Sequence, residues 1–228
     1  MQPTNPTRDS NPKFLILPAL PPDASAIIAC GNAAFAASPL RAAIWPAAKA
    51  HLTPASEFQH WRIARKAGKL EGGNLLSFKA VLSEAPERLV GYAAWMAPGA
   101  FAEQGSIEPE GEQLPACMDG EVHRGFLAQL DRERERVWEG DSGFWYLAAL
   151  GVDPEFQRQG VAAALLRWGL EQADAQGLPV YLEATPEGVA LYHRFGFETV
   201  RVLETLENSF EVPIMIRQPQ SKLPALEG

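Results

Sequence analysis

Residues 144–162 read FWYLAALGVDPEFQRQGVA, and this stretch decides the fold. Its first part, Phe144 to Val152, is nearly all apolar, which is typical of a central strand covered on both faces. A short loop and a helical pattern from about Gly160 to Ala175 follow, with a helix stop at Gly177. A second strand, Pro179 to Ala184, comes next, so the order predicts two parallel strands joined by a right-handed crossover.

The loop between the first strand and the helix, Gln157 to Ala162, has the properties of an anion site. Gly160 and Ala162 are small enough for the backbone to approach a ligand closely. The first N–H groups of the helix have no partner within it, and the positive end of the helix dipole lies in the same place. The loop lacks the Lys-Ser or Lys-Thr of a P-loop and the first glycines of a dinucleotide fingerprint. These features favour a pyrophosphate ligand other than those bound by a P-loop or a dinucleotide fingerprint.

Other strands and helices surround this unit. Helices are expected from Asp23, a good N-cap, and over Leu40 to His51 and Ser56 to Lys66. Alternating apolar residues predict an antiparallel pair of strands, Asn74 to Leu82 and Leu89 to Trp95. The remaining expected elements are a strand at Phe14 to Leu17, a loop at Pro98 to Asp119, a helix from Val122 through the charged run Asp131 to Glu135, a short helix from Thr185 to Gly196, and strands at Phe197 to Val202 and Val212 to Ile216. We interpret the charged run as a solvated helix face.

Length and composition indicate one domain. A chain of 228 residues with 46% hydrophobic residues buries a core of ordinary size. We expect this domain to cover residues 13–217. The polar, proline-bearing ends, 1–12 and 218–228, carry too little apolar surface to offset the entropy of ordering, so we expect mobile tails.

Charge and cysteine content exclude several classes of partner. The net charge is −8, with a sequence pI of about 5.1, which argues against nucleic acid or an anionic membrane surface as a partner. Cys30 and Cys117 suggest neither a disulfide framework nor a zinc site, and the histidines lack metal-ligand spacing, so no metal is expected. The start of the chain is unlike a signal peptide, and the simplest location is the reducing cytoplasm.

Three motifs in order carry a resemblance to a known family. Gln157, Gly160 and Ala162 match the pattern Q/R-x-x-G-x-G/A. The strand before it ends in Leu150, Val152 and Pro154, and after it come Leu191, Tyr192, Gly196 and Phe197 at the family's spacing. The sequence therefore resembles the GNAT acetyltransferases, closely over residues 140–217. Its motif sequences are most similar to those of puromycin-type and fungal small-molecule acetyltransferases. The resemblance implies an α/β (α+β) GNAT fold, with a mixed, mostly antiparallel sheet of about six or seven strands and helices on both faces.

The resemblance also implies a cofactor, acetyl-CoA, bound by a core at residues 144–202. The strand ends at Leu147 to Val152 and Tyr181 to Thr185 would splay apart, and the pantetheine arm would lie between them along main-chain groups of Leu150 and Val152. The pyrophosphate would take N–H groups of the loop and the first helical turn. The implied cofactor-binding residues are Leu150, Gly151, Val152, Gln157, Arg158, Gln159, Gly160, Val161, Ala162, Ala163 and Tyr192.

Tyr192 and Glu183 are the candidate catalytic residues. Acetyl transfer to an amine expels a thiolate, and a phenol held beside the sulfur can donate a proton to it, whereas the alternative for Tyr192 is a packed helix residue. Glu183 lies in a mostly apolar strand, where an ionisable group is costly unless it faces a cleft or a partner. It is our first choice of general base, and the alternative is a structural carboxylate.

The acceptor site is far less visible in the sequence. Phe35, Tyr146 and Trp95 are tentative acceptor contacts, and a plain core position is an equal alternative for Tyr146. Arg62, Arg65, Lys66 and Lys69 could attract an acidic acceptor, but a solvated helix face explains them as well. We expect N-acetylation of a small primary amine by direct attack in a ternary complex. The alternatives are acetylation of a protein lysine or N-terminus, favoured by an open groove, and a non-catalytic acyl-CoA sensor. The sequence leaves the oligomeric state undecided.

Overall fold

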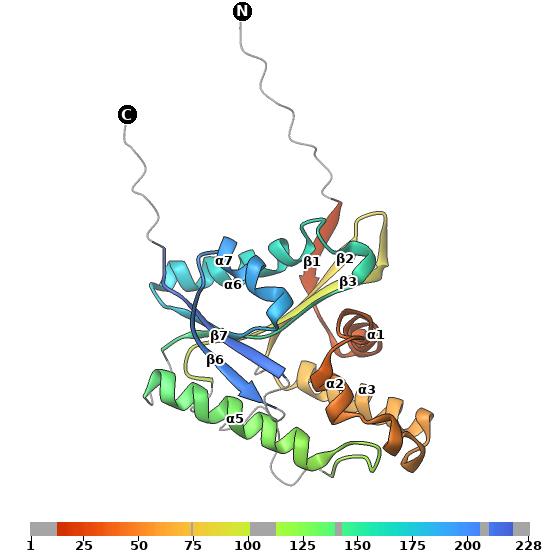
Figure 1. Ribbon diagram of the computed structural model, residues 1–228. Coiled ribbons are helices and arrows are strands. Elements are labelled where there is room, and N and C mark those ends of the chain that lie inside the picture. The colour runs from red at the N-terminus through yellow and green to blue at the C-terminus, as the bar shows by residue number, and fades with distance from the viewer. Residues whose placement is uncertain (1–12, 74, 101–112, 140–142, 206–209, 221–228) are drawn as a thin grey trace, which may run out of the picture.

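The computed structural model describes residues 13–73, 75–100, 113–139, 143–205 and 210–220 (Figure 1). Seven strands form one sheet in the order β1-β2-β3-β4-β5-β7-β6. The strands are β1 (Phe14–Pro18), β2 (Leu76–Leu82), β3 (Ala85–Met96), β4 (Trp145–Val152), β5 (Val180–Glu183), β6 (Glu198–Thr205) and β7 (Phe210–Arg217). The helices are α1 (Ala24–Ala34), α2 (Pro39–Ile44), α3 (Ala55–Glu71), α5 (Gly120–Trp138), α6 (Val161–Gln176) and α7 (Val189–Arg194), with short 3-10 turns between several of them.

Neighbouring strands are antiparallel except for β4 and β5, which are parallel and joined through α6. The predicted strand–helix–strand unit and the mixed, mostly antiparallel sheet are therefore confirmed. α6 ends where the sequence predicts, because Gly177 adopts a left-handed φ of 66° and caps the helix through its own N–H. The helix expected over Leu40 to His51 is shorter than predicted. It ends at Ile44 as α2, because Pro46 disfavours helical backbone in the residue before it.

Helices cover both faces of the sheet (Figure 1). α6 and α7 pack on one face, in a core that includes Leu165, Leu166 and Trp95, and α5 packs on the other through Phe126 and Leu130. α1 contacts β3 and β4. A Cβ atom on Gly169 would lie 2.4 Å from a ring atom of Trp95, so glycine at this position lets α6 approach the sheet closely.

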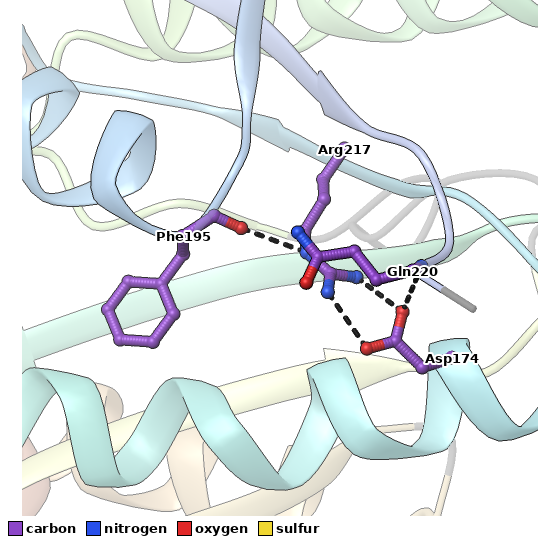
Figure 2. A network of polar contacts seen from close by, with 4 residues as sticks. All are labelled: Asp174, Phe195, Arg217 and Gln220. Atoms are coloured by element: carbon purple, nitrogen blue, oxygen red, sulfur yellow. Dashed lines mark hydrogen bonds and ion pairs between the residues drawn. The ribbon is translucent and has the colours of Figure 1, made fainter. Parts of the chain in front are cut away.

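A polar network fixes α7 to the end of the sheet (Figure 2). Arg217, the last residue of β7, makes a bidentate ion pair with Asp174 of α6 at 2.7 and 2.8 Å. Its Nε donates to the carbonyl of Phe195, directly after α7, at 2.9 Å. The N–H of Gln220 also donates to Asp174, at 2.8 Å, so contacts with the domain continue past the predicted boundary at residue 217. The expected tail at 1–12, and residues 221–228 of the expected tail at 218–228, lie outside the described residues.

Candidate active site

The sheet contains an opening between β4 and β5. These two strands pair only at Trp145 with Val180 and at Tyr146 with Tyr181. Beyond Tyr146, within the described residues, β4 continues to Val152 with β3 as its one strand partner, and β5 continues with β7. The main-chain groups of β4 that face β5 are thus left for another extended segment, which is the geometry that a pantetheine arm requires. We call this region the β4–β5 opening.

A β-bulge lies at the start of this opening. Trp95 is opposite Leu147 and Ala94 is opposite Ala149, so Ala148 is the extra residue in β4. A bulge bends its strand and increases the local twist, and bulges are frequent next to active sites. Here the bend occurs in β4 just beyond Tyr146, where β4 is no longer paired with β5.

The predicted anion site lies directly after β4. Arg158 and Gly160 both have left-handed backbone, with φ values of 59° and 90°, and left-handed residues of this kind occur in the backbone concavities that bind anions. A Cβ atom added to Gly160 would meet nothing within 4 Å, so the space above the turn is open. The carbonyl of Gly160 accepts the first helical bond, from Ala164. The N–H groups of Val161 to Ala163 precede that bond and have no partner within the helix.

Side chains of the loop shape it from within. Gln157 donates to the carbonyl of Val152 at 3.2 Å, and Gln159 donates to the carbonyl of Glu155 at 2.8 Å. Lys13 donates to the side-chain oxygen of Gln159. The two glutamine side chains are thus engaged within the loop, which leaves its backbone N–H groups for a ligand, and the residues present fit a pyrophosphate.

Tyr192 lies beside the opening on the α6 side of the sheet. It packs in the same core as Leu147 of β4 and Ala184, which directly follows β5, and its ring meets Phe197 edge-on at 5.7 Å. The side chain is buried, and burial raises the pKa of Tyr192 to about 12. The phenol therefore keeps its proton throughout the neutral range and can act as a hydrogen-bond donor.

A cavity of about 410 Å³ reaches the same opening from the other side of the sheet. Its wall near the opening is formed by Ala148, Glu183, Ala184 and Thr185. The predicted acceptor residues Phe35 and Tyr146 also line it, as do Trp45 and other residues of α1, α2, α3 and α5. The structure thus brings together Tyr192 on one side of the sheet and a cavity of small-molecule size on the other.

Glu183 faces this cavity with a cationic partner. Its Oε1 accepts from Arg134 of α5 at 3.1 Å, and the two side chains are only 7% and 6% exposed. Arg134 also pairs with Asp131 at 2.8 Å and lies over the ring of Tyr146 at 4.9 Å. Burial, and next the charge of Glu183, raises the pKa of Tyr146 well above its ordinary value, so this phenol also stays protonated.

Two expectations about this region are wrong. Trp95 does not face the acceptor: it is fully buried under α6, because the alternation of β3 turns it to the opposite face from Tyr92. The charged run after Leu130 is not only a solvated face, because Glu133 and Arg134 are buried. A signal for Arg134 was present in the sequence, since it continues the apolar stripe of Val122, Phe126 and Leu130 at the same spacing of one helical turn.

Comparison with known proteins agrees with this geometry. The family model for the Acetyltransferase (GNAT) family matches residues 81–197. An uncharacterised N-acetyltransferase of Schizosaccharomyces pombe is 30% identical over 142 residues, which is 58% of this chain and 58% of that protein's length.

Solved structures share the fold at low identity. A Corynebacterium glutamicum structure described as histone acetyltransferase HPA2 and related acetyltransferase has a TM-score of 0.58 at 22% identity, with 92% of this chain and 98% of that one covered. The Salmonella typhimurium protein yncA, solved with its cofactor acetyl-CoA, has a TM-score of 0.52 at 15% identity, with 92% and 96% covered. On these grounds the chain belongs to the GNAT family of acetyltransferases.

Proposed function

We propose that this enzyme acetylates a primary amine of a small molecule, by direct attack within a ternary complex. The observation that carries the proposal is the cavity of about 410 Å³ that ends at the β4–β5 opening. Its volume is typical of small-molecule sites, and its lining is mostly apolar with a few polar groups. A cavity of this kind holds the amine close to the opening, and orientation of two reactants contributes much of an enzyme's acceleration.

Acetyl-CoA supplies a thioester carbonyl for the amine to attack and a thiol as the leaving group. The backbone of the loop at Arg158 to Ala163 holds the phosphates, and the free edge of β4 at Leu150 to Val152 orients the pantetheine arm. Tyr192 donates its phenolic proton to the departing sulfur. Glu183 lines the cavity and is the group that accepts a proton from the acceptor's ammonium: it accepts from Arg134 at one oxygen, which leaves lone pairs for an ammonium N–H.

The cysteines support direct transfer. Cys30 and Cys117 are both buried free thiols, and burial, together with the charge of Asp153, raises the pKa of Cys30 to about 11. A thiol with so high a pKa is a weak nucleophile at neutral pH. Neither cysteine lines the cavity, so the described residues offer no cysteine for a covalent acetyl-enzyme.

The test is release of CoA from acetyl-CoA across two panels, one of small primary amines and one of peptides with free N-termini and lysines. We expect the small amines to support release and the peptides to support little. Release with peptides alone would replace the proposal by protein acetylation. Tight acetyl-CoA binding without release from any acceptor would replace it by an acyl-CoA sensor.

A further inference from the structure

Three cationic side chains gather on one wall of the acceptor cavity. Arg41 comes from α2, and Arg62 and Lys66 come from successive turns of α3. All three line the cavity beside Tyr92, whose ring lies 5.9 Å from the ammonium of Lys66. The wall is therefore locally cationic, although the net charge of the chain is −8.

No carboxylate of the described chain neutralises these three groups. Arg41 and Arg62 both donate to the same oxygen of Asn32, at 2.9 and 2.8 Å, and none of the three forms an ion pair with a described acidic residue. A guanidinium has five N–H donors, so one shared amide oxygen leaves most of them available. Both guanidiniums also lie over the ring of Trp45, with their central carbons 4.7 and 5.1 Å from its centroid, and these contacts help to hold them in place.

Without a bound anion, the three neighbouring cations cost free energy in these surroundings. Burial lowers the pKa of Arg41, Arg62 and Lys66, and the neighbouring cations lower the pKa of Arg62 and Lys66 further. Charges that are withdrawn from water and lie close to like charges destabilise the protein unless a counter-charge is supplied. The solvated helix face that the sequence allowed therefore does not describe Arg62 and Lys66.

The cationic wall and the Glu183 end occupy different parts of one cavity. Tyr92, beside the cations, is opposite Gly151, whereas Tyr146, beside Glu183, is opposite Met96. At about 3.3 Å per residue, the four-residue step from Tyr92 to Met96 along β3 spans roughly 13 Å. A molecule that fills the cavity can thus place one group at the cations while another lies at the β4–β5 opening.

We propose that the acceptor carries an anionic group, a carboxylate or a phosphate monoester, and that Arg41, Arg62 and Lys66 bind it while the amine reaches the opening. The inference rests on the proposed function of the cavity as the acceptor site. It narrows the substrate class from primary amines in general to amines with an acidic group several bonds away. Arg62 is central to the wall, since it shares Asn32 with Arg41 and lies one helical turn before Lys66.

The experiment compares pairs of acceptors in which only one member carries an anionic group. ε-Aminocaproate is compared with its neutral amide, and 6-aminohexyl phosphate with 6-aminohexanol, by kcat/KM for CoA release. Charge-assisted hydrogen bonds predict a preference of roughly 10- to 100-fold for the anionic member of at least one pair. The pair that shows it identifies carboxylate or phosphate as the bound group. Release from neutral and anionic amines at equal rates would overturn the inference and leave the proposed function standing.

Variants locate the binding group. Arg62→Gln is expected to remove most of the preference while acetyl-CoA affinity stays within about twofold. Arg132→Gln, on the exposed side of α5, is the matched control and should keep the preference. A loss of acetyl-CoA affinity in Arg62→Gln would overturn the inference, because it would mean that the cations bind the phosphates of acetyl-CoA. Thermal unfolding confirms that each variant is folded.

A binding measurement keeps the inference testable if no amine supports release. Calorimetry of caproate and caproamide, which lack the amine, is done with the wild-type protein and Arg62→Gln. Caproate should bind the wild type more tightly than caproamide does, and Arg62→Gln should abolish the difference. Equal binding of the two probes to the wild type would contradict the inference independently of any activity.

Discussion

Glu183 and Arg134 form a buried ion pair at the closed end of the β4–β5 opening. Each charge compensates for the hydration that the other loses on burial. The pair therefore fixes both positions without being a large net source of stability. Through Arg134 it also orients the ring of Tyr146. The pair therefore links helix α5 to the two strands that part at the site.

Arg134→Met tests this role. Removing one partner leaves Glu183 buried and uncompensated, and we expect a loss of about 3 to 5 kcal/mol in the free energy of unfolding, measured by urea denaturation. Arg136→Met is the matched control: its side chain is 63% exposed, and its pairing with Glu133 is stretched to 3.9 Å. The control should lose less than about 1 kcal/mol. Equal losses in the two variants would show that the buried pair does not hold α5 in place.

Tyr192 is the second residue on which the account depends. Because Tyr192 is buried in the core that contains Leu147 and Ala184, and its ring meets that of Phe197, replacing it with phenylalanine removes the hydroxyl and preserves most of the packing. We expect Tyr192→Phe to lower kcat by roughly 10²- to 10⁴-fold, the usual contribution of a general acid, with the Kd for acetyl-CoA unchanged. Stopped-flow release of CoA and calorimetry provide the two values. An unchanged kcat would reduce Tyr192 to a packing residue.

Among the elements, α6 and the loop before it do most to form the cofactor site. The helix begins at Val161, directly after Gly160 with its φ of 90°, a backbone conformation that costs a residue with a Cβ atom about 1 to 2 kcal/mol. A β-branched residue is the least tolerant of it. The turn and the exposed N–H groups therefore depend on glycine at this position.

Gly160→Val is expected to weaken acetyl-CoA binding at least about tenfold, since it distorts the turn that presents the N–H groups. Gly125→Ala is the control, because Gly125 lies within α5 and has open space around it. Alanine is the better helix former, so this variant should be stabilised by up to about 1 kcal/mol with unchanged binding. If Gly160→Val bound acetyl-CoA normally, the loop would not be the pyrophosphate site.

Local patterns were sufficient to predict the strand–helix–strand unit. β4 is continuously apolar, and α6 has an apolar stripe and a glycine stop, so neighbouring residues alone define both elements. The face that Trp95 occupies could not be predicted, because residues 91–96 are apolar or small on both faces and a shift of one residue reverses every side chain. The cavity could not be predicted either, since its cations and Glu183 come from segments far apart in the chain.

At the scale of the whole molecule, all four tyrosines have raised pKa values. Burial is the first cause in each case, at Tyr92, Tyr146, Tyr181 and Tyr192. A tyrosine in an unfolded chain ionises near pH 10. Above that pH the folded state retains more protons than the unfolded state, so stability falls as pH rises.

The expected result is that the free energy of unfolding is independent of these groups below about pH 10 and falls from there through about pH 12, where Tyr192 ionises in the fold. Ultraviolet absorbance of tyrosinate measures the effect directly. The native protein should show almost no tyrosinate at about pH 10, and the urea-unfolded protein should titrate all of its tyrosines near that pH. A native protein that ionises with the unfolded one would contradict the burial of these phenols.

The central claim is that acetyl passes directly from acetyl-CoA to an amine across the β4–β5 opening. Initial velocities of CoA release, measured while acetyl-CoA and an active acceptor are both varied, test it most directly. Direct transfer requires both substrates to be bound at once, and the account predicts reciprocal plots that intersect. Parallel plots would mean that an acetyl-enzyme forms before the acceptor binds, and would contradict the claim.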